Sequence, residues 1–132
     1  MILVDSNVPM YLVGGDHPHK ADANRLLQRL VVEGEPLVTD AEVFQELLHR
    51  YMAISRRDRI QLAFDVLRAA VDRVFPIEEG DVLDAKDIAA THPGLAARDA
   101  LHAAVMRRRG VSRVLTFDRG FDAVAGIERI PA

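Results

Sequence analysis

The chain has 132 residues, with 17 Lys or Arg, 20 Asp or Glu and no Cys, so its formal net charge is −3. This length favours a single domain over residues 1–132, and the lack of Cys excludes a disulfide framework, a cysteine zinc site and a thiol nucleophile. No apolar run reaches the ~20 residues that a membrane helix needs, and the N-terminus lacks the basic region of a signal peptide, so we expect a soluble, cytoplasmic protein with no membrane contact.

Short apolar runs alternate with helical patterns along the chain. The runs predict strands at 2–4, 36–39, 73–77, 114–117 and 127–130, the last at an edge. The helical spacing of apolar residues predicts helices at 18–33, 41–53, 56–71, 79–91, 96–109 and 119–125. Strands that alternate with one or two helices are typical of a three-layer α/β/α sandwich with a mainly parallel central sheet.

Several residues mark where the predicted helices begin and end. Gly34 and Gly110 each follow a helical pattern and favour its termination. Asp40 is a good N-cap for the helix that starts at 41, and capping explains this acid fully. Ser55 and Asp58 resemble a capping box at the start of the next helix.

Two acids follow apolar strands of the predicted sheet. Asp5 comes directly after the first strand, and Asp118 follows the strand at 114–117. In open parallel sheets, ligands bind at the carboxyl ends of the strands. These two carboxylates are therefore expected to face one crevice.

Two further acids interrupt apolar or neutral helical stretches. Glu46 lies among large apolar residues, and Asp99 lies in the first turn of its helix. Each acid also has an ordinary structural explanation. The charge of Asp99 can interact favourably with the N-terminal end of its helix, and Glu46 can lie on a solvated helix face with Glu42 and Arg50.

The four acids are more informative together than singly. Carboxylates held close to one another repel and resist ionisation, and a divalent cation removes that repulsion. Oxygen ligands in a chain without Cys suit Mg²⁺ or Mn²⁺. Such a site can activate water and stabilise the charge on an attacked phosphodiester.

Each of the four acids lies in a short motif, namely ILVDSN at 2–7, AEVFQELL at 41–48, RDALHAA at 98–104 and VLTFDRGF at 114–121. These motifs resemble those of the PIN-domain ribonuclease family, specifically the VapC toxins of type II toxin–antitoxin systems. They occur in the family's order and at typical spacing, and together they cover nearly the whole chain. The resemblance implies a PIN-like fold, an RNA substrate, a small VapB-like antitoxin as partner and a homodimer.

The resemblance also implies roles for individual residues. The metal-coordinating, catalytic acids would be Asp5, Glu46, Asp99 and Asp118. Residues that orient these carboxylates or water would be Ser6 or Asn7, and Thr116. Glu42 shares a helix face with Glu46 and is the alternative second acid, while Asp122 is either an auxiliary acid or a solvated one. The implied reaction is Mg²⁺- or Mn²⁺-dependent hydrolysis of an RNA phosphodiester.

The net charge of −3 alone argues against a nucleic-acid partner. Setting the four proposed ligands aside, however, leaves 16 acidic against 17 basic residues, and 15 of the basic residues are Arg. We expect Arg98, Arg107 and Arg119 to contact RNA phosphates, although Arg107 also suits a helix C-terminus.

His102 lies three residues after Asp99, but an ordinary hydrogen-bonded or solvated histidine is the favoured interpretation.

Other functions fit the residues less well. A phosphatase of the haloacid-dehalogenase type needs a second Asp where this chain has Asn7, and a receiver domain needs paired acids after the first strand. A catalytically silent PIN-like binding module stays an alternative, although it has no reason to keep all four acids. A housekeeping PIN nuclease without an antitoxin is the other alternative.

Overall fold

The structure, a computed structural model, describes residues 1–131. Its sheet has five strands, β1 (Ile2–Val4), β2 (Leu37–Asp40), β3 (Arg73–Phe75), β4 (Arg113–Leu115) and β5 (Glu128–Ile130). Their order is β3-β2-β1-β4-β5, and every neighbouring pair within the described residues runs parallel. The sequence predicted a mainly parallel sheet, and the observed sheet is parallel throughout.

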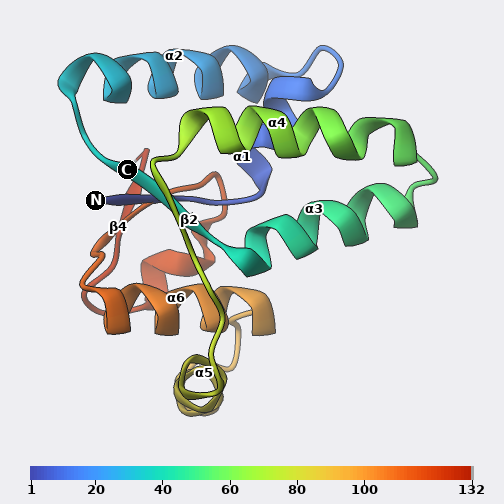
Figure 1. Ribbon diagram of the computed structural model, residues 1–132. Helices are drawn as coiled ribbons and strands as arrows, with labels where there is room; N and C mark the ends of the chain where they lie inside the picture. The colour runs from blue at the N-terminus through green and yellow to red at the C-terminus, as the bar shows by residue number, and fades with distance from the viewer. Residues whose placement is uncertain (132) are drawn as a thin grey trace.

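Helices cover both faces of this sheet. They are α1 (Asn7–Val13), α2 (Pro18–Glu33), α3 (Ala41–Ala53), α4 (Ile60–Ala70), α5 (Glu79–Thr91) and α6 (Ala97–Arg109), with short 3₁₀ turns η1 (Arg57–Arg59) and η2 (Arg119–Ala123). Figure 1 shows α2 and α4 on one side of the sheet and α5 and α6 on the other, which confirms the three-layer sandwich. Within residues 1–131, no helix has both the length and the apolar character needed to cross a bilayer.

The central strand β1 buries side chains on both of its faces. Ile2 and Val4 pack into the core beneath α2, α3 and α4, whereas Leu3 packs on the opposite side against Val105 and Met106 of α6. Successive side chains of a strand point to opposite faces, so a strand covered on both sides must be apolar throughout. This requirement explains the uninterrupted run that begins the chain.

The strand order places a crevice beside β1. The chain leaves β1 to form β2 on one side, and β4 later pairs with the other side of β1. Such a reversal in strand order opens a crevice at the carboxyl ends of the strands. Asp5 follows β1 and Asp118 comes three residues after β4, so both lie at this edge.

Two local predictions were wrong. The predicted helix 56–71 is divided into η1 and α4, and the Asp58 side chain pairs with Arg56 instead of forming a capping box with Ser55. Ser55 adopts a positive φ of 58°, which turns the chain between the helices. Helix α1 was not predicted, because seven residues are too few to show a helical period. It is stabilised by packing of Tyr11 and its neighbours on the core.

Candidate metal centre

A cavity of about 900 Å³ opens at the carboxyl end of the sheet. Acidic side chains from four separate segments line it, namely Asp5, Glu42, Glu46, Asp99 and Asp118. Basic side chains also line it, namely Arg50, Lys86 and Arg98. The structure therefore brings together the four acids that the sequence proposed as ligands, although they lie as far apart in the chain as positions 5 and 118.

Hydrogen bonds fix the orientation of Asp5 at the end of β1. The Thr116 hydroxyl donates to Oδ2 of Asp5 at 2.7 Å, and the Ser6 N–H donates to Oδ1 at 2.8 Å. Burial raises the pKa of Asp5, the charge of Glu46 raises it further, and His102 opposes this shift. A buried carboxylate whose pKa is raised lacks sufficient positive charge nearby.

Thr116 links Asp5 to the other side of the crevice. Its hydroxyl oxygen accepts from the Asn7 side-chain amide and from the Asp118 N–H, both at 3.0 Å. The Ser6 hydroxyl in turn donates to Oε2 of Glu46 at 2.6 Å. Ser6, Asn7 and Thr116 thus make the contacts expected of residues that orient the carboxylates.

His102 lies at the base of the acid cluster and has no solvent exposure. Its Nδ1 is 2.7 Å from Oδ2 of Asp40, and its Nε2 is 2.6 Å from Oε1 of Glu46. Burial alone lowers the pKa of His102, but Asp40 and Glu46 outweigh burial and raise this pKa well above its usual value. Both ring nitrogens therefore donate, and the imidazolium neutralises part of the acidic charge.

The sequence interpretation of Asp40 and His102 was incomplete. Asp40 does cap α3, since its Oδ1 accepts from the Val43 N–H at 3.0 Å, but its second oxygen holds His102. The favoured interpretation of His102 as an ordinary histidine missed this contact with the acids. The only available signal was its position one helical turn after Asp99, which places both on the same face of α6.

Asp99 and Asp118 complete the cluster from the α6 side. The pKa of Asp99 is raised to about 7, first by burial, then by the charge of Asp5 and by Asp118. Asp118 accepts the Gly120 N–H at 2.8 Å. A side chain at position 120 would place its Cβ 3.2 Å from Asp118 Oδ1 and 3.8 Å from Asp99 Oδ2, so glycine allows this loop to approach both acids.

The donor set fits a divalent cation. Carboxylate oxygens of Asp5 and Glu46 lie within 4.8 Å of each other, and the carboxylates of Asp99 and Asp118 border the same cavity. Carboxylate oxygens are the ligands that Mg²⁺ and Mn²⁺ prefer. The raised pKa values of Asp5 and Asp99 reflect negative charge that a cation would compensate.

The structure distinguishes the two candidate acids on α3. Both carboxylate oxygens of Glu46 are engaged, one by Ser6 and one by His102, and its side chain is only 10% exposed. Glu42 lines the cavity but lies farther out, and its pKa is raised by partial burial and by the charge of Glu46. Glu46 therefore occupies the more central position.

Three other predicted site residues lie outside the cavity. Asp122 forms two hydrogen bonds with Arg129, which lower the pKa of Asp122, so its position does not support a role as auxiliary acid. Arg107 donates to the Ala125 carbonyl, and Arg119 lines a separate hollow. Of the three arginines proposed to contact RNA, Arg98 alone lines the cavity.

Comparisons with known proteins agree on one family. The sequence model of the PIN-domain family matches residues 2–127 of this chain. Ribonuclease VapC13 of Mycobacterium tuberculosis is 58% identical over 130 residues, which cover 98% of this chain and 99% of that protein.

Two solved structures share the fold at lower sequence identity. One is Mycobacterium tuberculosis VapC20, described as a sarcin-ricin loop cleaving toxin, with a TM-score of 0.78 at 22% identity over 95% of each chain. The other is VapBC2 from Rickettsia felis bound to a promoter DNA fragment, with a TM-score of 0.74 at 13% identity over 98% of this chain and 97% of that chain.

Proposed function

The chain belongs to the PIN-domain family, and on that premise we propose that it is a Mg²⁺- or Mn²⁺-dependent endoribonuclease that acts as the toxin of a toxin–antitoxin pair. The observation that carries the proposal is the convergence of Asp5, Glu46, Asp99 and Asp118 on one cavity. Naming of a 58% identical relative as a ribonuclease supports the same activity.

In this proposal the four acids hold the cation. When bound, the cation would lower the pKa of a water molecule and offset charge on the phosphate oxygens. Thr116 and Ser6 hold the carboxylates of Asp5 and Glu46 in place through short hydrogen bonds. His102 balances part of the acidic charge from below, so that the carboxylates stay close together inside the protein.

Basic residues around the acids support a phosphodiester substrate. Arg50, Lys86 and Arg98 line the same cavity and are placed to meet backbone phosphates. We propose that RNA enters here, and that an RNA substrate places the protein in the cytoplasm. In this proposal the basic side chains attract the RNA polyanion, whereas the four acids hold the metal.

We further propose a VapB-like antitoxin and a second copy of this chain as partners. The solved VapBC2 structure, by its name, contains both partners of such a pair. Large apolar side chains are exposed on or directly after helices of this chain, including Leu48 and Met52 on α3, Ile54 directly after α3, Leu62 on α4, and Val82 and Leu83 on α5. Such side chains suit burial by a helical partner or a second subunit.

The proposal is tested with purified protein and single-stranded RNA. We expect cleavage with Mg²⁺ or Mn²⁺, no cleavage with EDTA, and no cleavage by Asp5→Asn under any of these conditions. Absence of metal-dependent cleavage in the wild-type protein would instead favour a silent binding module.

A second experiment separates a toxin from a housekeeping nuclease. The protein is induced with and without the product of an adjacent small gene, and new RNA ends are mapped. Growth arrest and new ends that appear only without this product are expected of a toxin. A housekeeping nuclease would cut RNA without binding any such product.

A further inference from the structure

Four rings gather on the surface beside the cavity, and we refer to Tyr11, His17, His19 and Phe117 as the ring cluster. Tyr11 and His17 stack with centroids 4.7 Å apart and an interplanar angle of 27°. His19 and Phe117 stack at 4.4 Å and 23°. Tyr11 meets Phe117 edge-on at 5.3 Å, which joins the two stacks into one surface.

The ring cluster adjoins the acid site directly. Phe117 precedes Asp118 in the chain, and its N–H donates to the Asn7 side chain at 3.3 Å. Tyr11 lies one helical turn after Asn7 on α1, a rise of about 5.4 Å. Because Asn7 and Asp118 both line the cavity, the ring cluster begins where the cavity ends.

The two histidines are the accessible part of the ring cluster. Tyr11 and Phe117 are partly buried and pack on the core, whereas His17 is exposed and the His19 side chain is 41% exposed. Nδ1 of His17 accepts the His19 N–H at 3.1 Å, so in the neutral ring the proton is on Nε2 and can be donated outward. The surface therefore offers ring faces with a polar edge.

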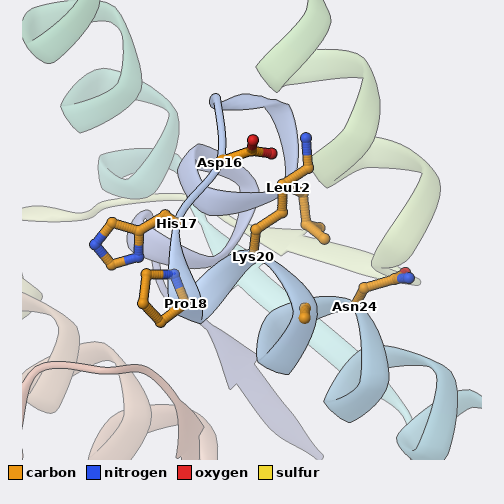
Figure 2. A pocket seen from close by; sticks show the side chains of 7 residues that line it. Leu12, Asp16, His17, Pro18, Lys20 and Asn24 are labelled. Carbon is orange, nitrogen blue, oxygen red and sulfur yellow. The ribbon is translucent and has the colours of Figure 1, made fainter.

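Open space lies on the other side of His17. Figure 2 shows the rings of His17 and Pro18 at one edge of a shallow hollow, with Lys20 in the middle and Asn24 at the opposite edge. The side of the His17 ring that faces this hollow is therefore open to a flat ligand. Lys20 and Asp16 both line this hollow, and the Lys20 ammonium donates to the Gly14 carbonyl at 2.9 Å, so the hollow carries charges of both signs.

We propose that the ring cluster is a base-stacking subsite for single-stranded RNA next to the bond that is cut. This inference rests on the proposed ribonuclease function. Unpaired bases stack on aromatic and imidazole rings, and such stacking tolerates many sequences because every base has a π-face. Bases inside a duplex are already stacked and cannot use these rings.

The surface chemistry favours RNA over a protein partner. Among the described residues, the large apolar side chains with high exposure lie away from the ring cluster, such as Val31 and Val32 at the C-terminal end of α2 and Leu48 and Met52 on α3. The ring cluster exposes imidazoles instead of aliphatic area. His17 and His19 also differ from His102, since among the described residues neither belongs to the buried group that His102 forms with Asp5 and Glu46.

The first test compares cleavage of a mixed-sequence, single-stranded RNA 12-mer by variants at His17 and at His92. We expect His17→Ala to raise KM by about 5-fold or more with little change in kcat, because stacking contributes binding energy and not chemistry. His17→Phe should restore KM, since it keeps the ring. His92→Ala, which removes a histidine outside the cavity and the ring cluster, is the matched control and should behave as the wild type.

The second test reports binding without cleavage. The chain has no Trp, so His17→Trp introduces a single indole into the ring cluster. In EDTA, the same RNA should quench this fluorescence, whereas Val32→Trp at an 86% exposed position of α2 should be unaffected. A blunt RNA duplex of the same length should quench little.

The outcomes separate this inference from the proposed function. If the wild-type protein fails to cut RNA in the presence of metal, the proposed ribonuclease function is wrong. The fluorescence quenching of His17→Trp by RNA then still tests whether bases stack on the ring cluster. Cleavage that is unchanged in His17→Ala, together with unquenched His17→Trp, refutes the subsite alone. If His17→Ala retains RNA binding but loses its co-purifying protein partner, the ring cluster is a protein contact and the inference is wrong.

Discussion

His102 on α6 holds Glu46 on α3, with its Nε2 only 2.6 Å from the Glu46 carboxylate. These helices meet at the carboxyl end of the sheet, although α3 follows β2 and α6 follows α5. The same ring reaches Asp40 at the end of β2, so one buried imidazolium joins a strand end to two helices. The acid site is consequently tied to the packing of the whole sandwich.

Replacing His102 should destabilise the protein strongly. In His102→Leu, Asp40 and Glu46 lose the cation between them, and breaking a buried ion pair in this way costs about 3–5 kcal/mol. Urea denaturation of the metal-free protein measures this loss, with His92→Leu as the control. A stability within about 0.5 kcal/mol of wild type would mean that His102 does not compensate these acids.

Asp5→Asn should abolish cleavage and leave the fold intact. Asparagine keeps the shape of the side chain but removes a charge that the cation needs. Since burial and the charge of Glu46 raise the pKa of Asp5, losing this carboxylate relieves repulsion in the metal-free protein. Circular dichroism and a thermal melt should match or slightly exceed wild type, while an RNA cleavage assay shows no product. A fully active variant would contradict the proposed metal site.

The two glutamates of α3 should differ in their effect on metal binding. Glu46→Gln is expected to weaken Mn²⁺ binding by at least ~10-fold, because it alters a carboxylate held by Ser6 and His102 in the centre of the cluster. Glu42→Gln, on the outer wall of the same cavity, should change affinity by less than about 3-fold. Titration calorimetry compares them, and a larger effect at Glu42 would reverse the assignment.

Metal affinity and stability should depend on pH in opposite ways. The pKa of Asp99 is about 7 in the folded, metal-free protein, so the carboxyl stays protonated there after the unfolded chain has lost its proton. This contribution to stability is present at low pH and is lost as pH rises towards 7. The melting temperature of the metal-free protein should therefore fall between pH 5.5 and 7.5, and it should fall less in Asp99→Asn.

Cation binding reverses this pH trend, because the cation needs the ionised carboxylate. Below pH 7, Mn²⁺ affinity should increase by about tenfold per pH unit for each proton released. Calorimetry in buffers of different ionisation enthalpy counts these protons. Affinity that does not change between pH 5.5 and 7 would contradict a ligand role for Asp99.

Arg108 should matter more for stability than its neighbour Arg107. Asp81 of α5 is fully buried, and its Oδ1 lies 2.8 Å from Nε of Arg108 on α6. Arg108→Met leaves this oxygen without its charged partner, at a cost of about 1–3 kcal/mol. Arg107→Met, which removes an exposed contact to a carbonyl, should change stability by less than about 0.5 kcal/mol.

The sequence predicted the strands and the acids well because both depend on local pattern. Ile2 to Val4 must be apolar where helices cover both faces of the sheet, and strand ends place Asp5 and Asp118 at one edge regardless of loop detail. These rules predict the sheet and the positions of Asp5 and Asp118, whereas the roles of Glu46 and Asp99 on helices were indicated only by the resemblance to the PIN-domain family.

The contacts that the sequence did not reveal depend on side chains far apart in the chain. The position of His102 one turn after Asp99 does not by itself indicate its role, because its partners Asp40 and Glu46 come from β2 and α3 and are brought to it only by folding. Helix α1 owes its existence to packing, and Ser55 takes a conformation fixed by the turn between α3 and α4. No local pattern records these three relationships.

The position of Asp5 has a consequence for the order in which the site assembles during synthesis. Asp5 is among the first residues made, but the hydroxyl of Thr116 that orients it is 111 residues later, and Asp118 comes later still. A growing chain that lacks β4 has no partner for one side of β1, and it lacks both Thr116 and Asp118. The complete acid cluster can therefore form only after the segment that follows β4 has been synthesised and β4 has paired with β1.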